Sequence, residues 1–245
     1  MHTQMDIPRG QEQAASGFVP LDPLNPRTPA PSPASDEALY AKAEGLALRT
    51  AFGCPYAGMN MQVYKGEVTA LRGRNGSGKT ALLLTMAGRM AHTDGTLSIL
   101  GQTMPKNHGK VQRRVGLALV DGINDIQENL TVYSVTASEF SLYGIKKKRE
   151  DIMAFLEEWG LGTVAHSKVR DLSRERHVLL GIALGLVNNP QALAVDDIED
   201  QLTRVQSERL MGKLLQVAHD RRIAVMVACT ERSLAQMADR VYHLG

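Results

Sequence analysis

Cysteine, aromatic residues and long apolar runs are all scarce in this sequence, and each scarcity limits what the protein can be. Only two of the 245 residues are cysteine, and aromatic residues make up 4% of the chain. We interpret Cys54 and Cys229 as small buried side chains of a reducing cytosol, because both lie in apolar stretches typical of strands or strand ends. No metal-binding spacing is present, and aliphatic residues must form most of the core.

Long apolar runs and an excess of charge are also missing. The longest apolar runs, such as 178–187, span about ten residues and contain glycine, which is too short to cross a bilayer. The N-terminus lacks the apolar core of a secretion signal. The net charge of +2 gives no reason to expect a nucleic-acid partner. We therefore expect a cytoplasmic protein that reaches a membrane only through a partner.

The composition divides the chain into a tail and one main domain. Residues 1 to about 36 are poor in apolar residues and contain seven prolines between Pro8 and Pro33. Such a segment cannot bury enough surface to offset its ordering entropy, so we predict a disordered tail over 1–38 and one domain over 39–245. A proline-rich docking peptide is an alternative reading of the tail.

The sequence is organised around a glycine-rich segment with the spacing of a phosphate-binding loop. This segment reads Gly73, Arg74, Asn75, Gly76, Ser77, Gly78, Lys79, Thr80. It lies between an apolar strand and a leucine-rich helix, so inward-pointing backbone N–H groups and the positive helix end together favour phosphate. We expect Lys79 to reach the β- and γ-phosphates and the Thr80 hydroxyl to bind magnesium. A glycine-rich turn before a core helix is the alternative, but it does not explain the four fixed positions.

Two alternating stretches before this segment predict an antiparallel meander. The first ends near Phe52, a turn is expected over 54–58, and a second strand follows at 59–64. Phe52 or Tyr56 could stack on an adenine ring, or either could be an ordinary core or turn aromatic.

The order of motifs resembles the nucleotide-binding subunit of an ATP-binding cassette (ABC) transporter. Residues 66–80 match the family's Gly-Glu-hydrophobic strand and its phosphate-binding loop, and the likeness continues from about 40 to 245. The resemblance implies an α/β fold of the P-loop NTPase class. It also implies a mostly parallel core sheet, an antiparallel β subdomain, and a helical subdomain at about 122–175.

The resemblance also assigns residues around the phosphates. Asp196 would hold magnesium together with Thr80; a strand ending in solvated acids is the alternative, which the phosphate-binding loop upstream disfavours. The family's catalytic glutamate is Asp197 here, one methylene shorter. The switch histidine is Thr230, which can donate a hydrogen bond but has no imidazole. These two residues are expected to be weak catalytic substitutes.

Further departures lie in the segments that serve the opposite subunit and the membrane partner. The signature Leu-Ser-Gly-Gly-Gln reads Leu172, Ser173, Arg174, Glu175, Arg176. Ser173 remains a helix N-cap that can donate to phosphate. Arg174 is either a phosphate contact or a solvated helix start, and Glu175 is expected to stand where an anion should dock. The family's glutamine is Val120, unless Asp121 or Asn124 replaces it, and the D-loop aspartate is Thr203.

The resemblance thus implies a subunit that binds ATP and Mg²⁺ at a head-to-tail homo- or heterodimer interface with weak or no hydrolysis. It would lie on the inner face of the cell membrane against an integral membrane transporter subunit, through the stretch 124–144. A basic cluster at 146–149 would lie near anionic lipid or form a solvated helix start. The main alternative is a non-catalytic nucleotide-sensing regulatory protein. A soluble mechanical ATPase or a P-loop kinase is a weaker option.

Overall fold

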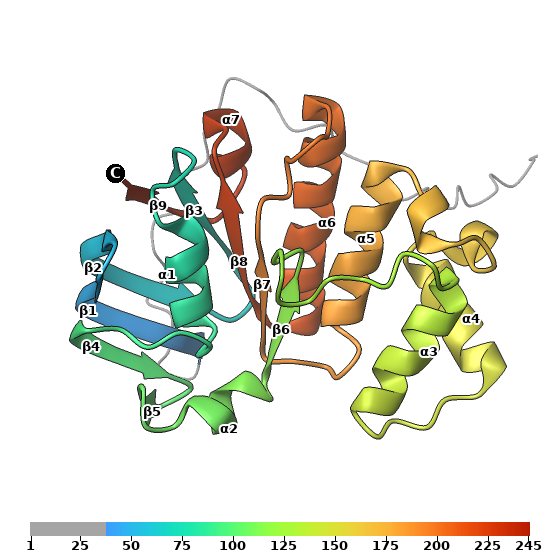
Figure 1. Ribbon diagram of the computed structural model, residues 1–245, viewed down its shortest axis with the longest axis horizontal. Helices are drawn as coiled ribbons and strands as arrows, with labels where there is room; N and C mark the ends of the chain where they lie inside the picture. The colour runs from blue at the N-terminus through green and yellow to red at the C-terminus, as the bar shows by residue number, and fades with distance from the viewer. Residues whose placement is uncertain (1–37) are drawn as a thin grey trace, which may run out of the picture. The chain divides into compact units, whose positions relative to one another are not determined.

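The computed structural model describes residues 38–245, which form two β-sheets with helices packed against them (Figure 1). The strands are β1 (Leu39–Thr50), β2 (Gly53–Tyr64), β3 (Val68–Gly73), β4 (Asp94–Ile99), β5 (Gln102–Thr103), β6 (Val115–Ala118), β7 (Ala192–Val195), β8 (Ala224–Cys229) and β9 (Arg240–Leu244). The helices are α1 (Lys79–Met86), α2 (His108–Gln112), α3 (Val132–Leu142), α4 (Arg149–Glu158), α5 (Arg174–Gly185), α6 (Arg204–Arg221) and α7 (Arg232–Ala235). The predictions for the proline-rich tail lie outside the described residues.

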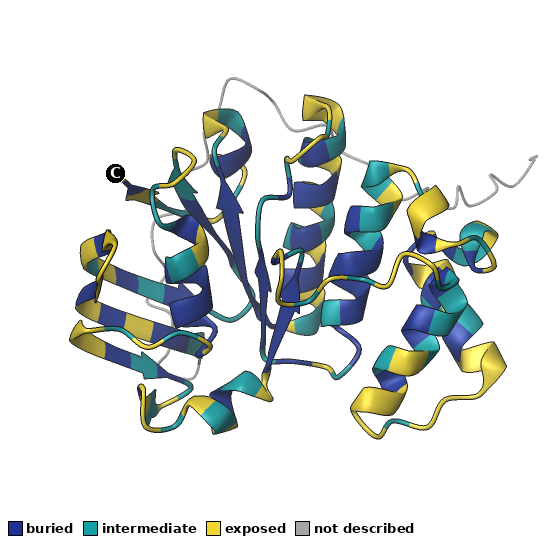
Figure 2. Cartoon of the chain, viewed as in Figure 1, coloured by how far each residue is buried: buried dark blue, intermediate teal, exposed yellow. Residues whose placement is uncertain are grey.

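The larger sheet is parallel, with strand order β6-β7-β8-β3-β9. Strands β7 and β8 are apolar at every position because both of their faces are covered, and Figure 2 shows them buried along their length. Alternate residues of β8 pack into the two different hydrophobic cores on either side of the sheet. Val225 and Val227 pack toward α5 and α6, whereas Ala224 and Met226 pack toward α1 and the second sheet.

The antiparallel sheet has the order β2-β1-β4-β5 and shares its core with α1. Leu82 and Leu83 of α1 are fully buried in that core, together with Leu46 and Val63 from the sheet. Helix α1 therefore lies between the two sheets, as Figure 1 shows, and the loop that precedes it is held from both sides.

The meander was predicted correctly, but its turn was placed wrongly. The chain turns at 51–52, and residues 54–58 belong to β2, with Leu48 opposite Tyr56. Pro55 was taken as a turn residue, yet β2 is an edge strand, where a missing N–H breaks no ladder bond. Cys54 is exposed rather than buried, because it lies at the open end of this edge strand, whereas Cys229 is buried as predicted.

Helices α3 and α4 occupy the segment in which helices were expected, and they share one hydrophobic core with α5 and α6. The Thr131 hydroxyl caps α3 by accepting a hydrogen bond from Ser134 N, at 3.1 Å. Phe140 and Leu156 are buried, while the far ends of both helices are exposed (Figure 2). No helix among residues 38–245 is both long enough and apolar enough to cross a membrane.

Candidate functional site

The loop between β3 and α1 lies at the carboxyl end of the parallel sheet, and close contacts fix two of its three glycines, Gly73 and Gly78. A Cβ on Gly73 would lie 2.3 Å from Ser77 Oγ, and one on Gly78 would lie 2.1 Å from the Pro55 carbonyl oxygen. Gly78 also has a φ of +89°, which side-chain-bearing residues rarely adopt. The β2 edge strand thus packs directly on the loop, and only glycine fits at the contact.

Two side chains of this loop have hydrogen-bonding capacity that the protein leaves unused. Lys79 is 7% exposed and donates from Nζ to the carbonyl oxygens of Gly73 at 2.9 Å and Arg74 at 3.0 Å. An ammonium group has three donors, so one remains. Ser77 Oγ is buried with no partner among the described residues. Phosphate oxygens would satisfy both groups, so the loop fits a bound nucleotide.

The two predicted magnesium ligands lie side by side. Asp196 follows β7 directly, and the parallel register brings it to the edge of the sheet at which β3 ends. Thr80 Oγ1 donates to Asp196 Oδ2 at 2.7 Å. Burial raises the pKa of Asp196, and the hydrogen bond from Thr80 partly opposes that rise. The hydroxyl and carboxylate are hard oxygen ligands suited to Mg²⁺, which takes most of its remaining ligands from phosphate and water.

Asp197 is held in an unusual conformation beside this pair. Its φ is +45°, in the left-handed region that non-glycine residues seldom occupy. Its Oδ1 atom is buried with no hydrogen-bond partner among the described residues. Burial raises the pKa of its carboxyl group, and nearby Asp200 raises it further. Asp197 lines a cavity of about 540 Å³ that also contains Lys79, Thr80 and Asp196.

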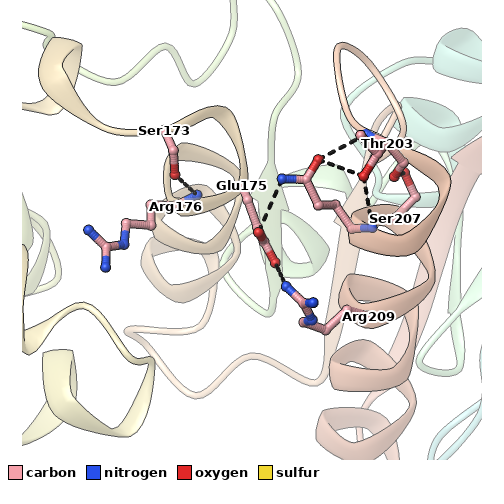
Figure 3. A network of polar contacts seen from close by, with 7 residues as sticks. Ser173, Glu175, Arg176, Thr203, Ser207 and Arg209 are labelled. Carbon is pink, nitrogen blue, oxygen red and sulfur yellow. Dashed lines mark hydrogen bonds and ion pairs between the residues drawn. The ribbon is translucent and has the colours of Figure 1, made fainter.

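The segment 172–176 lies at the start of α5 and is joined to α6 (Figure 3). Ser173 caps α5, since its Oγ accepts from Arg176 N at 3.4 Å. Glu175 does not stand at the open end of the helix as expected. Its carboxylate turns to α6, where Arg209 donates at 2.6 Å and Gln206 at 3.3 Å. The carboxylate is therefore removed from the position where we expected it to oppose an anion.

Residues 56–199 match the protein family described as ABC transporter, and this match spans more than half of the chain. The chain belongs to the ABC transporter family. The prediction from the motif order is thus confirmed at the level of the family.

Individual relatives are remote in sequence but similar over most of the chain. The lipoprotein-releasing system ATP-binding protein LolD of Anaplasma marginale is 26% identical over 197 residues, which are 78% of this chain and 88% of that protein. The bacitracin transport ATP-binding protein BcrA of Bacillus licheniformis is 27% identical over 187 residues, 76% of this chain and 60% of that protein.

Solved structures confirm the ABC ATPase fold. The structure of cbiO1 from Clostridium perfringens has a TM-score of 0.73 at 22% identity, covering 84% of this chain and 85% of that one. A dimeric ATP-binding cassette in a post-hydrolysis state, bound to ADP and Pi, has a TM-score of 0.70 at 20% identity, covering 83% of this chain and 94% of that one.

Thr230, which we predict to stand in place of the ABC switch histidine, follows β8, and its polar groups are already engaged. Its backbone N–H and its hydroxyl both donate to the Glu199 carboxylate, which also accepts from Glu231 N at 3.2 Å. Thr230 does not line the cavity that contains Lys79 and Asp197. The sequence reasoning missed this role of Glu199, which lies 31 residues from Thr230 in sequence.

Val120, which we predict to stand in place of the ABC glutamine, lies in a local hydrogen-bond network. Val120 is 2% exposed, and its N–H donates to Asn124 Oδ1 at 2.9 Å. Asn124 Nδ2 donates to the Leu117 carbonyl at 3.0 Å, so both ends of this amide are used. Of the two substitutes considered, only Asp121 lines the cavity.

The two candidate aromatics for adenine stacking have opposite surroundings. Tyr56 is buried, and its hydroxyl donates to Thr85 Oγ1 at 2.7 Å, so it is a core residue. Phe52 is fully exposed in the β1–β2 turn. Phe52 therefore remains the candidate, and stacking on a nucleotide stays a prediction.

Proposed function

We propose that this protein is an ATP-binding subunit of an ABC transporter, which binds Mg-ATP and hydrolyses it slowly or not at all. The observation that supports nucleotide binding most directly is the hydrogen bond between Thr80 and Asp196 beside the glycine loop. It places a hydroxyl and a carboxylate next to hydrogen-bond donors that residues 38–245 leave without a partner. Membership of the family agrees with ATP as the ligand.

Slow hydrolysis follows from what surrounds the terminal phosphate. The Asp197 carboxylate is one methylene shorter than glutamate, so a water molecule that it positions would lie too far from the phosphorus. Thr230 lacks an imidazole, and Glu199 already accepts its hydrogen. Each missing transition-state contact lowers the rate by about 10- to 1,000-fold, so two deficits are enough to make turnover hard to detect.

We extend the proposal to a head-to-tail dimer in which ATP stabilises association. A ligand that binds only the associated form favours that form by mass action, without being consumed. Ser173 at the open start of α5 is the residue expected to face the nucleotide of the opposite subunit. With a homodimer or with an intact partner, no composite site would hold the full set of catalytic groups.

A cavity of about 340 Å³ next to α3 is the place where we expect the integral membrane subunit to dock. Its lining includes Ile123, Leu142 and Tyr143, which are 50%, 78% and 45% exposed. Phe140, on the same helix, is buried and packs the core. The exposed apolar side chains are therefore surplus to the core, as expected for a surface that a partner covers.

Copurification from detergent-solubilised membranes tests this docking. Leu142→Asp should release the integral membrane partner, because it places a charge in an apolar contact. Val205→Asp is the matched control, since Val205 is also exposed, at 64%, but lies on α6. Retention of the membrane partner by the Leu142 variant contradicts the docking site. A soluble partner that is lost when residues 1–36 are deleted would favour the nucleotide-sensing alternative instead.

A further inference from the structure

Arg174 is not a solvated helix start, because it is tied to the segment that follows Asp196 and Asp197. Its Nε donates to the Asp200 carbonyl oxygen at 3.1 Å, and its terminal NH2 donates to Asp200 Oδ2 at 2.9 Å. The Arg174 side chain is 33% exposed and that of Asp200 46% exposed. The first residue of α5 therefore reaches across to the carboxyl edge of its own parallel sheet.

The same pair lines the nucleotide cavity of its own chain. The charged side chains of that cavity are two cations and four carboxylates: Lys79, Arg174, Asp121, Asp196, Asp197 and Asp200. The cavity is acidic overall, and a bound triphosphate adds negative charge. Lys79 donates to two loop carbonyls, whereas Arg174 donates only to Asp200 among the described residues, through its carbonyl and its carboxylate. Arg174 is thus the second cation available to a phosphate in this site.

Arg174 lies in the part of the cavity where the terminal phosphate of a bound nucleotide is expected. Thr80 and Asp196 would hold a magnesium ion that offsets the charge of the terminal phosphates, so the terminal phosphate would lie on the side of Asp196 and Asp197. Arg174 and Asp197 line the same cavity, so the guanidinium lies on this side of the site.

We propose that Arg174 leaves Asp200 and binds the terminal phosphate of the nucleotide held by its own chain, so that the single subunit distinguishes ATP from ADP. This inference rests on the proposed nucleotide binding. A planar guanidinium matches two phosphate oxygens as well as it matches one carboxylate. Asp200 does not lose every partner in the exchange, because Gln201 Nε2 also donates to its Oδ2 at 3.2 Å.

The test compares Mg-ATP and Mg-ADP affinities at a protein concentration at which sedimentation shows a monomer. Arg174→Ala should weaken Mg-ATP binding about 10- to 100-fold, the range of a charge-assisted hydrogen bond, and change Mg-ADP binding less than about 2-fold. The Mg-ATP affinity of Arg174→Lys should lie between those of the wild-type protein and Arg174→Ala, because lysine keeps the charge but lacks the planar guanidinium. Asp200→Asn should strengthen Mg-ATP binding by releasing the guanidinium.

Arg204→Ala is the control, since Arg204 is exposed and paired with Glu208 away from the cavity. Equal losses for Mg-ATP and Mg-ADP in Arg174→Ala would make Arg174 a structural residue and overturn the proposal. Unchanged monomer affinities with weaker ATP-dependent dimerisation would place Arg174 on the partner's nucleotide, which also overturns it. If the wild-type protein binds neither nucleotide, the proposed function itself fails. If the wild-type protein binds nucleotide and Lys79→Ala abolishes that binding, nucleotide binding stands, and a negative result for Arg174 overturns only the inference about Arg174.

Discussion

Thr80 and Asp196 are 116 residues apart in sequence, yet the Thr80 hydroxyl donates to the Asp196 carboxylate at 2.7 Å. The hydroxyl comes from the first turn of α1, and the carboxylate follows the last residue of β7. Their meeting follows from the parallel sheet, whose strand ends all lie at one edge. The two oxygen atoms form a candidate binding site for a hard cation such as Mg²⁺ next to the glycine loop.

Thr80→Val should remove the magnesium dependence of nucleotide binding. With Mg²⁺ present, the affinity for ATP should fall about 10- to 100-fold, because one metal ligand and its hydrogen bond to Asp196 are lost. With EDTA, the variant and the wild-type protein should bind ATP alike. Isothermal titration with and without Mg²⁺ measures this, and Thr103→Val in β5 serves as an exposed control. An equal loss in both buffers would mean that Thr80 does not serve the metal.

Gly78→Ala should destabilise the protein more than Gly76→Ala. Both glycines have a positive φ, which costs about 1 to 2 kcal/mol for alanine. A Cβ at Gly78 also meets the Pro55 carbonyl, whereas nothing lies within 4 Å of one at Gly76. We expect losses of about 3 kcal/mol and about 1 to 2 kcal/mol respectively, measured by urea denaturation. Equal losses would show that β2 does not constrain the loop.

The glycine loop was predictable from sequence because all of its chemistry is local. Its fixed residues lie within eight positions, and the strand and helix around it follow from short apolar runs. The β1–β2 turn was placed wrongly because its position depends on information that is not local. Pro55 was given its usual meaning as a turn residue, and the sequence does not show that β2 is an edge strand.

The long-range pairs were beyond prediction. Arg174 with Asp200 and Glu175 with Arg209 are separated by 26 and 34 residues, and each partner is an ordinary surface residue when taken alone. The resemblance to ABC proteins drew attention to Arg174 and Glu175 as departures, but gave no direction for their side chains. The packing of α5 beside α6 directs Glu175 toward Arg209 (Figure 3), and Asp200, in the segment before α6, directs Arg174.

Glu199 should make the stability of the protein fall as the pH rises. Its pKa lies above the ordinary 4.5, chiefly because of burial, although backbone N–H groups of Thr230 and Glu231 oppose the rise. The titratable groups that face it are Asp197, Glu231 and Cys229. Folding therefore favours protonated Glu199, and its contribution to stability is present below pH 4.5 and lost as the pH rises through the higher folded pKa.

Glu199→Gln should lack this dependence, because an amide does not ionise. The free energy of unfolding from urea titrations between pH 4.5 and 8 should then fall less steeply for the variant than for the wild-type protein. Glu208→Gln is the control, since the Glu208 side chain is 36% exposed and paired with Arg204 on the same helix. A steeper decline in the variant would contradict the prediction, because it would mean that ionisation of Glu199 stabilises the fold.

Arg209→Ala should destabilise the junction of α5 and α6 by about 1 to 2 kcal/mol. Glu175 is 19% exposed in its side chain, so it would be left largely buried with only Gln206 as a donor. Arg204→Ala removes an exposed i,i+4 pair and should cost less than about 0.5 kcal/mol. Thermal and urea unfolding of both variants measure the difference. If the two losses are the same, the contact to Glu175 contributes little.

The central claim is that this subunit binds Mg-ATP without turning it over at an appreciable rate. The most direct test measures ATP affinity and steady-state phosphate release on the same purified protein, beside Lys79→Ala. Our account predicts micromolar binding that Lys79→Ala abolishes, and phosphate release no faster than that of the variant. Brisk hydrolysis by the wild-type chain alone would contradict the account, because it would show that Asp197 and Thr230 suffice for catalysis.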